Sequence, residues 1–169
     1  GIDYGTVINN KSNTGEDWDL IASTVPNNEK SLIAHIEDQL PYLLNSQREH
    51  FIARYFLEAI EPSGWLGKSL DEIQIETNLD YVDLENVLTK LQGVEPTGLF
   101  ARNLSECLRL QIIEKGLMCN GLSVLLDNLA LLGKGDLKSL MRKIDCDERK
   151  IKDFLVIIRS VDPKPGSVF

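Results

Sequence analysis

A chain of 169 residues, 43% of them hydrophobic, is long enough to bury one core of ordinary size or two small helical ones. No run in it approaches the roughly 18 consecutive apolar residues that a membrane-spanning helix needs, so we expect no membrane association. Its 18 Lys and Arg against 26 Asp and Glu give a net charge of -8. Most of this surface should repel phosphate, so a protein partner fits the composition better than duplex DNA does.

The charge is unevenly distributed along the chain. Residues 1–133 hold 9 Lys and Arg against 20 Asp and Glu, whereas residues 134–169 hold 9 against 6. If the chain contacts DNA, the contact is expected in this last, more basic segment.

The residues that usually carry chemistry do not form a known catalytic pattern. The cysteines Cys107, Cys119 and Cys146 lack the close pairing of zinc and redox motifs, so we expect buried, reduced thiols and a cytoplasmic location. We find no glycine-rich phosphate loop, no paired-histidine motif and no nucleophile with a recognisable base. The sequence therefore predicts no enzymatic activity, no cofactor and no metal site.

The first elements are a linker followed by helices. Residues 1–28 are rich in Asn, Ser, Thr, Gly and Asp without a sustained period, which predicts an acidic, poorly ordered linker. From Glu29 onward apolar residues recur at helical spacing, and no alternating run indicates a strand. Pro41 should end or kink the first helix. Ser46 should cap the second helix, which Pro62 should stop.

Two more helices are expected after Ser69 and Asp80, and then the pattern breaks sharply within residues 91–111. Pro96 removes an amide donor and Gly98 permits a turn that a side chain would oppose, so the chain must bend here. Asn103 is expected to cap a new helix with an apolar stripe that includes Leu104. We call this segment the corner; its expected structural residues are Leu91, Pro96, Gly98, Ala101, Asn103, Leu104, Cys107 and Leu108.

Three polar residues at the corner are explained by neither the break, the cap nor the apolar stripe. These are Gln92, Arg102 and Gln111. They either bond free carbonyls at helix ends or meet a partner, and the sequence leaves both open. Arg102 is the sharpest candidate, because a guanidinium fork can hold either a set of carbonyls or a partner carboxylate.

An internal sequence repeat relates residues 69–96 to residues 136–163 at a constant offset of 67 residues. Each copy predicts a helix, a short turn, a second helix, and then an acidic residue followed by proline. This is the layout of a helix-turn-helix, so a DNA-binding transcription regulator is one hypothesis. Packed helical hairpins produce the same pattern and are the other. Both hypotheses are all-helical, so we predict an all-α fold that contains two helix-turn-helix-like pairs.

At the corner, LTKLQGVEPTGLFARNLSECLRLQ (residues 88–111) resembles the signature of the bacterial RNA polymerase sigma-54 factor family. Three further blocks agree in order: SLIAHIEDQL (31–40), IEPSGWL (60–66) and IRSVDPKPGSVF (158–169). The chain departs from the family pattern at Leu99-Phe100, where a smaller Val-Gly pair is usual, and at Trp65, where Tyr is commoner.

The resemblance implies a piece of a sigma-54-type transcription initiation factor, its core-binding domain, which docks on bacterial core RNA polymerase with the flap of the β subunit as one contact. It also implies two small helical subdomains, residues 29–116 and residues 117–169, which suits the two helix-turn-helix-like pairs. The activator ATPase and promoter DNA would be met only through other parts of the full-length protein. A start at Gly1 rather than Met also leads us to expect a piece of a longer chain. The expected polymerase-binding residues are Gln92, Arg102, Glu106, Arg109 and Gln111.

Overall fold

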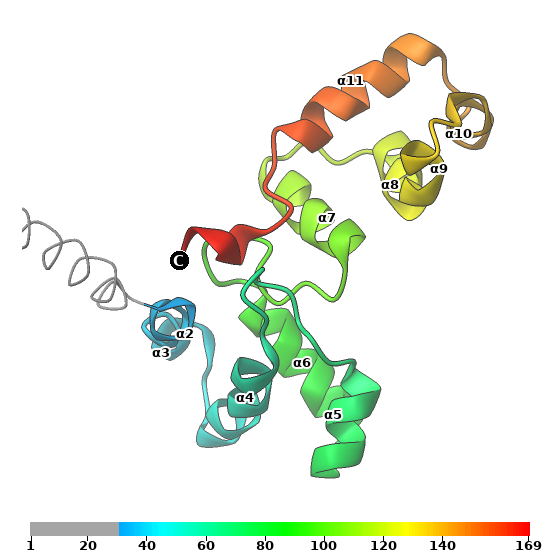
Figure 1. Cartoon of the computed structure of the whole chain (residues 1–169). Coiled ribbons are helices and arrows are strands. Elements are labelled where there is room, and N and C mark those ends of the chain that lie inside the picture. Colours follow the sequence, from blue (N-terminus) through cyan, green and yellow to red (C-terminus); the bar gives the residue numbers. More distant parts are fainter. Residues whose placement is uncertain (1–30) are drawn as a thin grey trace, which may run out of the picture.

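The computed structural model describes residues 31–169, and within this range every regular element is helical (Figure 1). Its one β-like feature there is an isolated antiparallel bridge between Ile60 and Leu66. The predicted all-α class is confirmed. The linker expected over residues 1–28 lies outside the described residues.

Serine caps begin three of the helices that precede the corner. Ser31, Ser46 and Ser69 each accept a hydrogen bond from the backbone N–H three residues later, which satisfies a donor that the helix leaves free. Asp80, expected to cap in the same way, takes the N-cap position without a side-chain bond. Pro41 lies in the first turn of a short helix, where its missing N–H costs no helical bond. The helices are α2 (Leu32–Glu37), α3 (Leu40–Leu43), α4 (Gln47–Ala59), α5 (Leu70–Thr77) and α6 (Tyr81–Leu91).

Acidic and amide caps begin three of the helices after the corner. Asn103, Asp136 and Asp147 accept hydrogen bonds from the backbone N–H groups three residues on. The helices are α7 (Leu104–Glu114), α8 (Asn120–Asp127), α9 (Leu129–Gly133), α10 (Leu137–Ile144), α11 (Glu148–Arg159) and the 3-10 turn η2 (Pro165–Val168).

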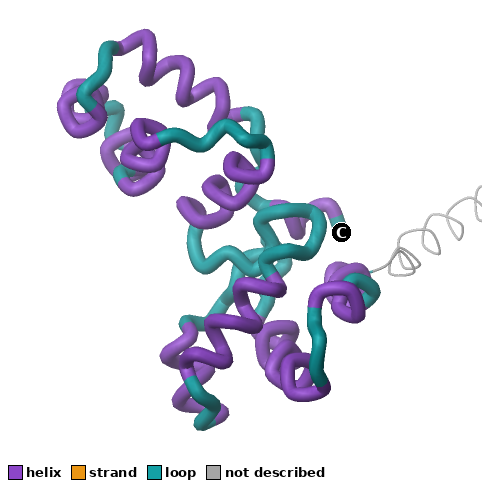
Figure 2. Tube along the Cα trace, turned by 180° about the vertical axis from the view of Figure 1, so that it is seen from behind, coloured by secondary structure: helices purple, strands orange, loops and turns teal. Residues whose placement is uncertain are grey.

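The buried apolar residues form two separate clusters. The first cluster runs from Ile36 to Phe100 and is supplied by α2 to α6 and the turn that follows. The second cluster runs from Leu108 to Val161 and is supplied by α7 to α11. The two helix groups lie at opposite ends of the molecule, and the loops of the corner run between them (Figures 1 and 2).

The internal repeat at an offset of 67 residues is also present in the backbone conformation. The connection between α5 and α6 starts at Asn78, and that between α10 and α11 starts at Asp145. Both residues are left-handed, with φ of 56° and 60°, and each donates its N–H to the carbonyl four residues earlier. Asn and Asp tolerate this region better than most residues do. The helices of each pair pack on each other.

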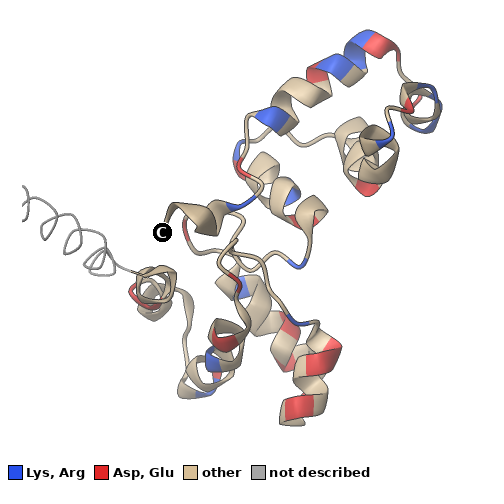
Figure 3. Cartoon of the chain, in the orientation of Figure 1, with Lys and Arg blue, Asp and Glu red and all other residues tan. Residues whose placement is uncertain are grey.

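The two helix groups differ in their balance of charged residues (Figure 3). Residues 31–100 hold 4 Lys and Arg against 12 Asp and Glu, whereas residues 104–169 hold 11 against 9. Acidic side chains gather on α5 and α6 in particular. Across residues 31–169, none of the helices combines the length and apolar character needed to cross a membrane.

Candidate functional site

The backbone of the corner is shaped by one glycine and one buried aromatic residue. Gly98 has φ of 109°, and a Cβ there would come within 2.9 Å of the Gln111 Nε2 atom and 3.0 Å of the Cys107 Sγ atom. Phe100 is also left-handed, with φ of 65°, although it carries a large side chain. Complete burial of its ring and a 2.8 Å hydrogen bond from its N–H to the Gly64 carbonyl hold this conformation.

A carboxylate gathers the polar groups on the inner side of the corner. The Glu106 Oε1 atom accepts from the Arg102 backbone N–H at 2.8 Å and from Gln92 Nε2 at 3.0 Å. The Arg102 guanidinium donates to both carboxylate oxygens, with its shortest contact at 2.7 Å. The same Gln92 amide donates to the Phe100 carbonyl at 3.0 Å, which ties the end of α6 to the start of α7.

This arrangement sets the charge state of Glu106. Burial pushes the pKa of the carboxyl upward, but the hydrogen bonds and charge of Arg102, with the Gln92 amide, outweigh it and leave the pKa below its usual value. The pKa of Arg102 is raised in turn, chiefly by its hydrogen bonds to Glu106. The network therefore holds an ionised pair at neutral pH.

Two glutamines fasten the two acidic-proline turns in the same way. The Gln111 carboxamide donates to the Asp162 carbonyl at 2.5 Å and accepts from the Asp162 N–H at 2.8 Å. The Gln39 carboxamide donates to the Glu95 carbonyl at 2.7 Å and accepts from the Glu95 N–H at 2.8 Å. We call these contacts the two clasps. The Glu95 carbonyl also lies 2.9 Å from His35 Nε2.

Arg109 belongs to a third set of contacts, between α7 and α8. Its guanidinium donates to the Ser123 hydroxyl at 2.6 Å, the Ser123 carbonyl at 3.3 Å and the Asp127 carboxylate at 2.9 Å. The structure thus brings Gln92, Arg102 and Glu106 together and places Gln111 and Arg109 elsewhere on α7. Each of the five expected residues has a partner within the chain.

The last segment of the chain returns to the first helix group. The Trp65 indole N–H donates to the Pro163 carbonyl at 2.8 Å, and the Gly166 N–H donates to the Ser63 carbonyl at 2.8 Å. A Cβ on Gly166 would come within 2.5 Å of the Gly64 nitrogen, so this approach needs glycine. We call residues 162–169 the strap; it connects the second helix group to the turn that precedes α5.

Some expectations for the corner need correction. Leu104 is 37% exposed rather than part of the buried stripe, because it occupies the first position of α7 and only later residues face the core. Cys107 is buried as expected, Cys146 is half-buried, and Cys119 is exposed at the start of α8. Burial is also the main cause that raises the pKa of the Cys107 thiol.

Gln39 and the strap are parts of this site that the sequence patterns did not reveal. Their partners lie far away along the chain, so no local pattern reveals them; the agreement of the blocks at residues 31–40 and 158–169 with one family was the available signal. Over residues 31–169, no group of three or more His, Cys, Asp or Glu is arranged to hold a metal ion.

These features define an all-helical module in which a polar corner, two clasps and a strap fix two helix groups to each other. The model of the family described as "Sigma-54 factor, core binding domain" matches residues 22–169. The chain belongs to this family, as its sequence resemblance suggested.

Similar proteins with curated names agree with this family assignment. The chain is 41% identical over 155 residues to the RNA polymerase sigma-54 factor of Cereibacter sphaeroides, and this match covers 92% of the chain and 36% of that protein. Identity to the RNA polymerase sigma-54 factor of a Rhodobacter capsulatus strain is also 41% over 155 residues, with the same two shares. For that of Rhizobium meliloti strain 1021, identity is 36% over 140 residues, or 83% of the chain and 27% of the relative. The chain thus spans about a third of the length of these curated relatives.

Proposed function

We propose that the chain is the part of a sigma-54-type transcription initiation factor that docks on bacterial core RNA polymerase, with the flap of the β subunit among its contacts. The match of the core-binding-domain family across residues 22–169 carries this proposal. Contacts with promoter DNA and with an activator ATPase are assigned to other parts of the full-length protein. Docking on a partner protein makes and breaks no covalent bond, so this segment needs no catalytic residue for it.

The two buried clusters support a division into two subdomains. The second cluster includes Leu108 and Ile112 of α7, whereas the first cluster ends at Phe100. We therefore place the boundary between residues 100 and 104 rather than after residue 116, so that α7 belongs to the second subdomain. On this division the corner itself is the joint.

The five candidate residues take two different roles in this proposal. Three of them, Gln92, Glu106 and Gln111, form hydrogen bonds with other groups of the same chain. We therefore assign them the role of positioning the two subdomains. Arg109 positions α8 against α7. Arg102 has both a positioning role and a binding role. Its hydrogen bonds to Glu106 brace the corner, and its side chain, which remains 44% exposed, contacts polymerase.

Co-elution with core RNA polymerase tests the proposed function. The chain is mixed with bacterial core enzyme, or with duplex DNA at the same salt concentration, and passed over a size-exclusion column. We expect co-elution with polymerase only. Co-elution with DNA and not with polymerase would instead support the helix-turn-helix regulator, which the comparisons do not favour.

Arg102→Glu then separates the two roles of this side chain. If Arg102 only braces the corner, the variant loses melting temperature and helicity. If its exposed edge meets polymerase, a variant that remains folded binds more weakly. Arg54→Glu, an exposed arginine on α4 without a hydrogen bond or ion pair among residues 31–169, is the matched control.

A further inference from the structure

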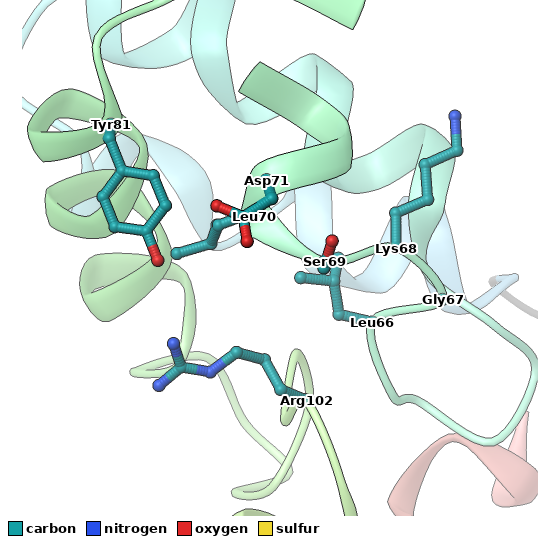
Figure 4. Close-up of a pocket in the computed structure, with 8 residues that line it drawn as sticks. All are labelled: Leu66, Gly67, Lys68, Ser69, Leu70, Asp71, Tyr81 and Arg102. Atoms are coloured by element: carbon teal, nitrogen blue, oxygen red, sulfur yellow. The ribbon is translucent and has the colours of Figure 1, made fainter. Parts of the chain in front are cut away.

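A hollow of about 340 Å³ opens beside the corner, and Arg102 forms one of its walls (Figure 4). The starts of α5 and α6 supply the other walls. Its floor includes Leu66 and Leu70, which are almost completely buried. A volume near the lower end of the range for ligand pockets suits the tip of an inserted side chain. The lining residues are Leu66, Gly67, Lys68, Ser69, Leu70, Asp71, Tyr81 and Arg102.

Two hydrogen-bond donors face each other across this hollow. The Tyr81 hydroxyl and the Arg102 guanidinium point toward one another in Figure 4. Glu106 occupies Nε and one terminal nitrogen of Arg102, and no residue among 31–169 accepts from the other terminal nitrogen. The Tyr81 hydroxyl likewise has no hydrogen bond within that range. Because Glu106 already immobilises the guanidinium, a ligand would meet it without a further entropic cost of ordering.

An acceptor lies on the α5 side of the same hollow. The Asp71 carboxylate has no ion pair or hydrogen bond among the described residues. The two lining cations are already compensated, because Glu106 neutralises Arg102 and Glu76 holds the Lys68 ammonium at 2.9 and 3.0 Å. The remaining charge is the negative charge of Asp71, which opposes entry of a carboxylate. An ammonium group could pair with Asp71, but it has no acceptor atom for the donors of Arg102 and Tyr81.

The geometry points to a site for an uncharged carboxamide, the tip of an Asn or Gln side chain that core RNA polymerase inserts into this hollow. A carboxamide carries an acceptor oxygen and a donor NH₂ on adjacent atoms, so one group satisfies both walls. Its oxygen accepts from Arg102 and Tyr81, and its NH₂ donates to Asp71. This inference rests on the proposed function, since it names the chemistry by which the docking partner is recognised at the corner.

Two conservative substitutions test the site through binding to core RNA polymerase. Asp71→Asn removes the acceptor charge, and Tyr81→Phe removes one donor. Neither group makes an internal hydrogen bond within residues 31–169, so the circular dichroism spectrum and melting curve should stay close to those of the unsubstituted chain. We expect each variant to raise the Kd for fluorescently labelled chain by about 3- to 10-fold, the effect of losing one neutral hydrogen bond or of making one charge-assisted bond neutral.

Matched controls lie elsewhere on the surface. Asp153→Asn on α11 repeats the loss of an acidic charge, and Tyr42→Phe on α3 repeats the loss of a hydroxyl at a residue that is 89% exposed. Neither residue has a hydrogen bond or ion pair among residues 31–169. Both controls should leave the Kd within about twofold of the unsubstituted value.

The pattern of the two variants decides the ligand. Weaker binding by both supports a carboxamide. Tighter binding by Asp71→Asn with weaker binding by Tyr81→Phe means that a carboxylate enters, and weaker binding by Asp71→Asn alone means that a cation does; either result overturns the assignment. Unchanged binding by both shows that the hollow is not used, while docking itself stands. If the unsubstituted chain does not bind polymerase, the proposed function fails and this inference fails with it.

Discussion

The two proposed subdomains share one layout of helices and turns but bury different amounts of apolar surface. Both contain a helix pair with a left-handed residue at the equivalent turn, and both end in an acidic-proline turn held by a glutamine. The first cluster contains 17 buried apolar residues and the second contains 9, surrounded by many that are only half-buried. One helix of the second subdomain, α9, has no buried residue at all. The same layout therefore gives a well-filled core in one subdomain and a shallow one in the other.

Local helix signals and apolar burial are therefore separate contributions to stability. Caps and turns determine where the helices begin and end in both subdomains, whereas the free energy of unfolding depends on the apolar area removed from water. The second subdomain should be the one that opens first, because low local burial lowers the free energy of local unfolding.

The largest effect is expected from matched truncations of the two core phenylalanines. Phe56→Ala in the first cluster should lower the free energy of unfolding by about 3–5 kcal/mol, because the fully buried ring leaves a cavity. Phe154→Ala in the second cluster should cost about 3 kcal/mol, near the lower end of that range, since its shallower surroundings can collapse. Urea denaturation followed by circular dichroism measures both. A larger cost for Phe154→Ala would reverse the comparison.

Removing each clasp should reveal a second difference. Gln111→Ala leaves the Asp162 peptide without two hydrogen bonds and should cost about 1–3 kcal/mol. Gln39→Ala should cost less, because His35 remains 2.9 Å from the Glu95 carbonyl, a closer partner than the Cys107 thiol, which lies 3.6 Å from the Asp162 carbonyl. Gln47→Ala, at an exposed residue of α4 with no hydrogen bond among residues 31–169, is the control and should stay within about 0.5 kcal/mol of the unsubstituted chain. Equal costs for the two clasps would mean that the histidine contact adds nothing.

The joint between the subdomains should be sensitive to acid. The folded pKa of Glu106 lies below its ordinary value of 4.5, so its stabilising contribution is fully present above that value. The contribution is lost as the pH falls through the folded pKa. At pH 7, Glu106→Gln should cost about 1–3 kcal/mol. The cost should shrink when the unfolding free energy is measured toward pH 3, and a cost independent of pH would contradict an ionised pair at this position.

The smallest effect is expected from exposed ion pairs on the first subdomain. Arg48 contacts the Asp83 carboxylate at 2.8 Å, but its side chain is well exposed to solvent. Arg48→Ala should change the free energy of unfolding by about 0–1 kcal/mol, because water and salt screen such pairs. Thermal unfolding at low and high salt measures this. A loss comparable to that of a clasp would show that the acidic surface of this subdomain depends on its few cations.

The local features were predictable from the sequence, because each of them depends on residues close together along the chain. The cap at Ser46, the bend at Pro96 and Gly98, and the helix that begins after Asn103 are found where they were expected. Leu104 was misplaced, since the apolar pattern alone does not tell the first residue of a helix from its buried face.

The rest of the site depends on distant contacts. Gln39 and Glu95 are 56 residues apart, and Trp65 and Pro163 are 98 apart, so neither pairing has a local signature. All five residues singled out as polymerase contacts have partners within the chain. The sequence could not show this, because a polar residue near a helix end looks the same whether it bonds a carbonyl or a partner. Their contact with polymerase stays a prediction.

Hydrogen exchange of the chain with and without bacterial core RNA polymerase tests most directly the claim that one docking module spans both subdomains through the corner. The amides of the corner, of the start of α5 and of α7 should exchange more slowly in the complex, and the shallow second subdomain should gain more protection than the first. No polymerase-dependent protection anywhere in the chain would contradict the docking role. Protection confined to one subdomain would contradict the claim that the corner joins them into a single module.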